Sequence, residues 1–112
     1  MKFLPLASML AAAALAACGS STNNRPLYDG VPFKAKAKPV DKKTSRAVFQ
    51  VEIKGADRSV KGAREAADHA GTTYCVTNYG SSNIAWVIDP ADEEAQLTLT
   101  DGRATFQGTC TP

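Results

Sequence analysis

Two stretches in the first half of the chain alternate apolar and polar residues, the pattern of a half-buried β-strand. In the first, residues 31–38, every second residue is apolar and Pro32 and three lysines lie between them. A proline and a row of charges suit a strand at the edge of a sheet. In the second, residues 47–54, the apolar set is Ala47, Phe49, Val51 and Ile53. We predict two strands, joined by a loop over 39–46.

A helix is predicted between the second strand and Gly80. After a turn at residues 55–57, apolar residues recur at spacings of three and four, which is typical of one helical face. These residues are Val60, Ala63, Ala67, Ala70 and Tyr74. Asp57 or Ser59 can cap the start of the helix, and Gly80 suits a left-handed stop. Gly62 and Gly71 each cost about 1 kcal/mol relative to alanine, so we expect the helix to depend on tertiary packing.

Three further strands are predicted after the helix. Ile84, Trp86 and Ile88 share one face of the first, which favours a place for Trp86 in the core over a role in binding. An acidic loop follows at residues 92–94. Asp101-Gly102 then forms the two-residue turn of a hairpin between strands 97–100 and 103–106. That register pairs Thr100 with Arg103 and places Leu97, Leu99, Ala104 and Phe106 on a shared apolar face.

These elements predict an α+β fold, a two-layer sandwich in which one helix packs on a small antiparallel-rich sheet. The order along the chain is strand-strand-helix-strand-strand-strand, and the order of strands within the sheet is not readable from it. The domain is expected over residues 31–112. Residues 18–30 precede it as a flexible tether, because they are polar and rich in turn-forming residues.

The first seventeen residues have the composition of a secretory signal peptide. Lys2 supplies a positive start, residues 3–17 are uncharged and rich in leucine and alanine, and small residues precede Cys18. The fifteen uncharged residues are too few to cross the roughly 30 Å hydrocarbon core of a bilayer as a helix. A transmembrane anchor is therefore disfavoured.

Leu15-Ala16-Ala17-Cys18 resembles the lipobox of bacterial lipoproteins. The resemblance implies cleavage before Cys18, a thioether-linked diacylglycerol on its sulfur, and acylation of the new amino terminus with a chain such as palmitate. Two acyl chains already give stable anchoring. Gly19 stands where an aspartate is the usual inner-membrane retention signal, which favours the outer membrane, facing the periplasm. An ordinary signal peptide with a nearby cysteine is the alternative.

Cys75 and Cys110 remain as a pair once Cys18 is assigned to lipid, in a compartment that permits oxidation. Counting by two along the last strand places Cys110 on its apolar face, and Cys75 lies at the flank of the buried helical stripe. A helix on that face brings the two sulfurs together, so we predict a disulfide. By chain entropy such a bond contributes about 4 kcal/mol. Two unpaired buried thiols are the alternative.

Basic residues are concentrated near the tether. Residues 19–46 carry a net charge of +5 and residues 47–112 a net charge of −4. The basic residues that follow the tether are Lys34, Lys36, Lys38, Lys42, Lys43 and Arg46. They could contact anionic lipid or the carboxylates of peptidoglycan, with about 1 kcal/mol from each cation beside an anionic surface. Edge protection and solubility form the simpler interpretation. Nucleic acid is not an expected partner.

His69, the only histidine, is the one candidate for catalysis. Glu65 lies one helical turn before it and could orient the imidazole. A general base also needs a nucleophile or substrate proton within reach, and no serine or cysteine is marked for that role. The sequence has no CxxC, HxxxH or calcium-loop pattern, and Glu65 with His69 makes only two ligands where zinc needs at least three. We predict no catalytic residue, metal or cofactor.

Four motifs resemble those of small Gram-negative envelope lipoproteins that have no assigned activity. They are Tyr28-Asp29-Gly30, Gly62-Ala63-Arg64-Glu65-Ala66, Tyr74-Cys75 and Gly108-Thr109-Cys110. The resemblance implies a fold and a compartment but no activity. We expect a non-enzymatic, membrane-anchored module that binds an envelope protein or the cell wall. A small periplasmic hydrolase or ligand-binding enzyme subunit that uses His69 is the alternative, and a direct lipid-surface binder is a third.

Overall fold

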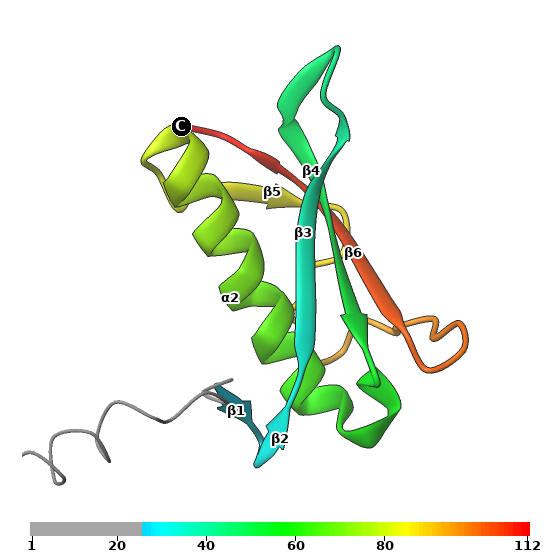
Figure 1. Ribbon diagram of the computed structural model, residues 1–112. Coiled ribbons are helices and arrows are strands. Elements are labelled where there is room, and N and C mark those ends of the chain that lie inside the picture. Colours follow the sequence, from blue (N-terminus) through cyan, green and yellow to red (C-terminus); the bar gives the residue numbers. More distant parts are fainter. Residues whose placement is uncertain (1–25) are drawn as a thin grey trace, which may run out of the picture.

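The computed structural model describes residues 26–112 (Figure 1). The predicted signal peptide, Cys18 and most of the predicted tether lie outside the described residues. Figure 1 shows one long helix, α2 (Val60–Tyr79), lying across one face of an antiparallel sheet. The predicted α+β class is confirmed. Within residues 26–112, no helix has the length and apolar character needed to cross a membrane.

The main sheet has four strands, whose spatial order differs from their order along the chain. β3 (Lys34–Asp41) pairs with β4 (Ser45–Lys54), which pairs with β6 (Ala104–Cys110), which pairs with β5 (Ile84–Trp86). The last strand of the chain therefore lies inside the sheet. β3 and β5 form its two edges, which confirms an edge position for the strand that carries the lysines.

The core lies between the sheet and α2, where the alternating positions of the two central strands face the helix. Its largest fully buried side chains include Phe49, Val51, Ile53 and Phe106. The helix contributes small residues, among them Ala63 and Ala67, both with no exposed surface. Small residues on the helix allow its backbone to approach the sheet closely, so the bulk of the core comes from the strands.

Ser59 caps the start of α2: its hydroxyl accepts a hydrogen bond from the Gly62 N–H (3.0 Å). Asp57, the other candidate, lies in a short 3-10 helix, η1 (Ala56–Arg58). Gly80 ends α2 in the left-handed conformation with φ of 69°, as predicted. Val60 was expected on the buried face, but 41% of its surface is exposed, because it lies in the first turn beyond the edge of the core.

The predicted tether is too long at its carboxyl end. β1 (Leu27–Tyr28) pairs with β2 (Val31–Pro32) in a separate hairpin, and the turn residues Asp29 and Gly30 both have positive φ. Asp29 also accepts a hydrogen bond from the Ser59 hydroxyl (2.7 Å), which ties the turn to the helix start. Asp-Gly is the preferred dipeptide of a type I′ turn, and this signal could have identified the hairpin.

The first predicted strand, residues 31–38, is two elements. Phe33 leaves the ladder between β2 and β3 and is buried in the core, beneath the guanidinium of Arg58, which lies 5.1 Å from its ring centre. At its other end β3 continues to Asp41 and β4 begins at Ser45, so the connecting turn is much shorter than the predicted loop over 39–46. The strand predicted at 84–88 also ends early, at Trp86, and Ile88 is exposed.

The last predicted hairpin forms only at its closing pair. Asp101 and Gly102 both have positive φ and Thr100 pairs with Arg103, as predicted, but residues 97–99 form no ladder with β6. Leu97 and Leu99 are half-buried against the core. Residues 92–95 are bonded to Arg64 of α2, so the chain approaches β6 from the helix layer and pairs with it only next to the Asp101-Gly102 turn.

Candidate functional site

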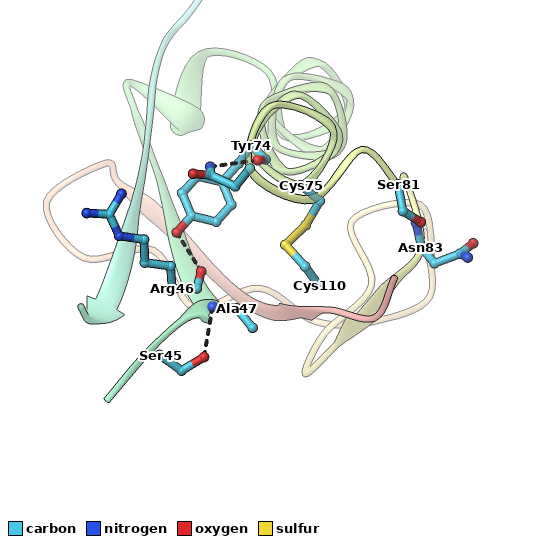
Figure 2. Close-up of a disulfide and its surroundings, with 9 residues drawn as sticks. Ser45, Arg46, Ala47, Tyr74, Cys75, Ser81, Asn83 and Cys110 are labelled. Atoms are coloured by element: carbon cyan, nitrogen blue, oxygen red, sulfur yellow. Dashed lines mark hydrogen bonds between the residues drawn. A yellow bond between two sulfur atoms is a disulfide. The ribbon is translucent and has the colours of Figure 1, made fainter. Parts of the chain in front are cut away.

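The predicted Cys75–Cys110 disulfide joins α2 to the end of β6 (Figure 2). Both cysteines are buried and their Cα atoms are 5.5 Å apart. Beside the bond, the Tyr74 hydroxyl donates to the Arg46 carbonyl (2.6 Å), and the Tyr74 ring stacks on Phe49 with centres 4.9 Å apart. Burial, and to a smaller extent Tyr79, raises the pKa of Tyr74, while the nearby Arg46 acts in the opposite direction. The disulfide thus links the last part of α2 to the end of β6 at one end of the core.

The side of the sheet opposite α2 carries a group of basic side chains, which we call the cationic face. Because side chains alternate along a strand, even positions of β3 and β4 and odd positions of β6 point away from the buried core. The exposed cations on this face are Lys34, Lys36, Lys38, Lys54 and Arg103. They surround a single carboxylate, Glu52, which pairs with Arg103 at 3.6 Å.

The cationic face also offers neutral hydrogen-bonding groups. Between the cations lie the amide side chains of Gln50 and Gln107 and the hydroxyl of Thr105, none of which is buried. No hydrogen bond within residues 26–112 involves these three side chains. The face is therefore a polar surface with excess positive charge, open to a ligand that offers carboxylates, hydroxyls and amides.

The six basic residues singled out in the sequence do not all join this face. Lys34, Lys36 and Lys38 do, whereas Lys42 and Lys43 lie in the exposed turn between β3 and β4. Arg46 is an exposed even position of β4 but lies at the turn end of the strand, next to Tyr74 and away from the other cations. The turn is held by Asp41, which accepts bonds from the Lys43 N–H (3.0 Å) and the Thr44 hydroxyl (2.9 Å). These bonds lower the pKa of Asp41 below its ordinary value, and the bond from the Thr44 hydroxyl has the largest effect.

Lys54 and Arg103 belong to the cationic face but were not predicted as part of it. Lys54 lies directly across the ladder from Lys34, and Arg103 lies just before β6 on the far side of β4. They are distant in sequence from the lysine row and only the strand order brings them together. The period-two pattern of β4 placed Lys54 on its polar face, but nothing in the sequence placed β6 beside β4.

A groove of about 640 Å³ runs between the edge strand β3 and the helix α2, and we call it the edge groove. Small side chains line both walls, which is why the space remains open: Ala35 and Ala37 on the strand, Ala66, Ala70 and Thr73 on the helix. Tyr28 and Pro26 close it at the β1 end. Burial, with the Glu65 carboxylate nearby, raises the pKa of Tyr28.

His69, the only candidate for catalysis in the sequence, lines the edge groove. Its side chain is exposed and its ring centre lies 6.3 Å from that of Tyr28. Among the described residues it forms no hydrogen bond or ion pair with Glu65 or with a hydroxyl group. A base that catalyses hydrolysis is normally oriented by a neighbour and placed against a nucleophile, and neither contact is present in the described part of the chain.

Arg64 is buried and makes a structural contact that was not predicted from the sequence. Its guanidinium donates to the backbone carbonyls of Asp92 (2.6 Å) and Ala95, and so holds the acidic loop against α2. Asp92, Glu93 and Glu94 themselves are exposed, as predicted for a solvated loop. An arginine inside an alanine-rich helical pattern was the only available signal.

Comparison of the chain with protein-family models, with curated proteins and with solved structures finds no match. Within residues 26–112 no three histidine, cysteine or acidic side chains lie close enough together to hold a metal ion. The candidate site is accordingly defined by geometry alone, and it consists of the cationic face and the edge groove.

Proposed function

We propose that the protein is a non-enzymatic lipoprotein of the outer membrane whose domain binds the anionic cell wall with its cationic face. The lipobox-like Leu15-Ala16-Ala17-Cys18 supports a lipid anchor on Cys18, and Gly19 supports the outer membrane, facing the periplasm. A disulfide between Cys75 and Cys110 is consistent with an oxidising compartment. The tether would hold the domain close to the membrane, within reach of the wall.

The observation that carries this proposal is the composition of the cationic face. Five exposed cations surround one carboxylate, which gives the face an affinity for a polyanion. The neutral amides and hydroxyl between the cations match the sugar hydroxyls and peptide amides of peptidoglycan, whose stem peptides also carry carboxylates. Lipid headgroups offer phosphate oxygens and hydroxyls but few amides. Peptidoglycan therefore matches the mixture of groups on this face more fully than anionic lipid does.

The alternative of a small hydrolase that uses His69 receives less support. His69 lies in a groove, but among residues 26–112 no hydrogen bond joins it to Glu65 or to a hydroxyl group. Alanines and aromatic rings line the groove together with polar side chains such as Thr73 and Asn78. These features suit contact with another chain better than proton transfer.

The test is sedimentation of the protein, purified from membranes in a non-ionic detergent, with purified peptidoglycan sacculi. Lys36→Glu/Lys54→Glu reverses two charges on the cationic face. If each cation contributes about 1 kcal/mol at an anionic surface, the variant binds about 30-fold more weakly or worse. Lys42→Glu/Lys43→Glu makes the same charge change in the β3–β4 turn and is the matched control, with binding expected to stay close to that of the unchanged protein.

Two further measurements separate wall binding from general charge attraction. Binding to sacculi is expected to weaken as salt is raised, because exposed charges are screened. Because acyl chains insert into any bilayer, vesicles are compared by the excess binding to anionic over neutral lipid. Lys36→Glu/Lys54→Glu should reduce this excess less than it reduces binding to sacculi. Equal loss of sacculus binding in the two double variants, or a larger effect of Lys36→Glu/Lys54→Glu on the vesicle excess than on sacculi, would contradict the proposal.

A further inference from the structure

Among residues 26–112, no strand pairs with the outer edge of β3, and the ladder register shows which peptide groups form that edge. The Val87 N–H donates to the Gln107 carbonyl (2.8 Å), and the Thr111 N–H donates to the Asn83 carbonyl (2.9 Å). Peptide groups at odd positions along β6 and just after it therefore face β5. Because the direction alternates along an antiparallel strand, those at even positions face β4.

The same alternation extends across β4 to β3. Even positions of β6 lie opposite odd positions of β4, so β4 uses its even positions, such as Glu52, to pair with β3. Glu52 lies opposite Lys36, which leaves the peptide groups of Ala35 and Ala37 pointing away from β4. Pro39 belongs to the same outward set and has no N–H to lose, which fits its place on a free edge.

We infer that the free edge of β3, together with the edge groove, binds an extended segment of another protein that adds to the sheet as a fifth strand. Strand addition needs an exposed edge for backbone hydrogen bonds and pockets for alternate side chains. Ala35 and Ala37 supply the edge. The groove beneath them, walled by Ala70 and Thr73 of α2, receives every second side chain of the added strand.

The lysine row selects the chemistry of the partner. An added strand directs its other side chains to the outer side of the sheet, next to Lys34, Lys36 and Lys38, all of which are exposed. Opposite charges on neighbouring strands attract, and like charges repel. The fitting segment alternates small or medium apolar residues with acidic ones. Over residues 34–38 the strand edge offers about 17 Å, enough for about five residues of partner.

A second copy of this chain does not fit the site. Pairing two β3 edges in antiparallel fashion would bring lysine rows together, and charged edge strands are a known means by which proteins avoid such self-association. The site shares the lysine row with the proposed wall contact, and Lys34 also lines the groove, but Ala70 and Thr73 lie on the helix side of the sheet. A change at these helix residues therefore tests this site without altering the wall contact.

The probe is a fluorescein-labelled, end-capped heptapeptide that alternates four valines with three aspartates, titrated with the detergent-purified protein by fluorescence anisotropy. Saturable binding is expected, and a peptide with lysine in place of aspartate should bind about tenfold more weakly or not at all. Absence of saturable binding at protein concentrations up to about 1 mM, or equal binding of the lysine peptide, overturns the inference.

N-methylated peptides test the backbone contact without changing the protein. In antiparallel addition the valines exchange hydrogen bonds with Ala35 and Ala37, so methylation of valine nitrogens should weaken binding about tenfold or more, whereas methylation of aspartate nitrogens should not. Parallel addition reverses this pattern and equally supports the inference. Binding that survives both modifications means that the segment does not join the sheet, and the inference fails.

One pair of variants locates the peptide in the edge groove. Thr73→Glu places a charged side chain in the groove and should weaken binding about tenfold, while Val76→Glu adds the same charge on an exposed part of α2 outside the groove and should not. Thr73→Glu should leave sedimentation with sacculi unchanged, which separates this site from the wall contact. Equal effects of the two variants on peptide binding would refute the placement.

Discussion

Gly71→Ala should destabilise the protein, although the same change in an exposed helix stabilises it. Gly71 is buried on the face of α2 that meets the sheet. A methyl group there would overlap the Trp86 ring at Cη2, lie 2.6 Å from its Cζ2, and lie 3.2 Å from Phe49 Cε2. The indole has little room to withdraw, because it packs edge-on against Phe49 (5.3 Å between ring centres) and against Phe106 (6.5 Å).

The magnitude follows from two opposing effects. Replacing a helical glycine by alanine contributes about 1 kcal/mol in favour of folding. Forcing an additional methyl group into a packed core costs about 1–3 kcal/mol, and here the neighbour that must move is a ring wedged between two others. We expect Gly71→Ala to lower the free energy of unfolding by about 1–2 kcal/mol, or Tm by about 4–10 °C for a domain of this size.

The assay is urea unfolding of the oxidised protein, followed by the fluorescence of Trp86, the only tryptophan, and by far-UV circular dichroism. A second background shows the cause. In Trp86→Leu the ring is gone, so Gly71→Ala should there stabilise the fold by about 1 kcal/mol, the ordinary helix preference. If Gly71→Ala stabilises the unchanged protein, the close approach of helix and indole does not exist and the reasoning is wrong.

Three other outcomes are expected. Cys75→Ala/Cys110→Ala should lower the free energy of unfolding by about 4 kcal/mol in a urea titration, because the chain between these positions is no longer closed into a loop, and a loss below about 1 kcal/mol would contradict this. Arg64→Ala should cost about 2–3 kcal/mol and speed proteolysis of the acidic loop, since two charge-assisted bonds to its carbonyls are lost; unchanged cleavage would show that the loop is held otherwise. The Asp41 carboxyl should titrate below its ordinary pKa of 3.8 in ¹³C NMR. Thr44→Val should raise that pKa. Because the hydrogen bonds that lower the pKa are made to the ionised carboxyl, the turn should loosen as the pH falls through it. An unchanged Asp41 pKa in Thr44→Val would exclude the hydroxyl as the cause.

Local patterns were sufficient where a residue's environment depends on its near neighbours in the chain. The alternation in β4, the left-handed stop at Gly80 and the Asp101-Gly102 turn are all set within a few residues. The alternation of side chains along a strand also predicted a contact between distant residues. Counting by two placed Cys110 on the buried face, opposite Cys75 on the helix. The α+β class and the disulfide were predictable for this reason.

The sequence was less informative about the candidate site, because the site depends on which strands are neighbours. The row at Lys34, Lys36 and Lys38 was visible, but Lys54 and Arg103 join it only through the order β3-β4-β6-β5. The edge groove was not predictable either. It exists because Ala35 on the strand and Ala70 on the helix are too small to fill the space between two elements whose separation the larger core residues set.

By itself, then, the amino-acid sequence determined the helix and the central strand β4, since both follow from short-range patterns. It also determined the pairing of two cysteines, because helix and strand periodicity place both on buried faces. Only the tertiary structure decided why Gly62 and Gly71 are tolerated within the helix: a methyl at Gly62 would meet the Tyr28 carbonyl and Phe33, and one at Gly71 would meet Trp86. The sequence shows the cost of a helical glycine, because that cost is local. Its benefit comes from the close approach of segments distant in the chain, which depends on packing.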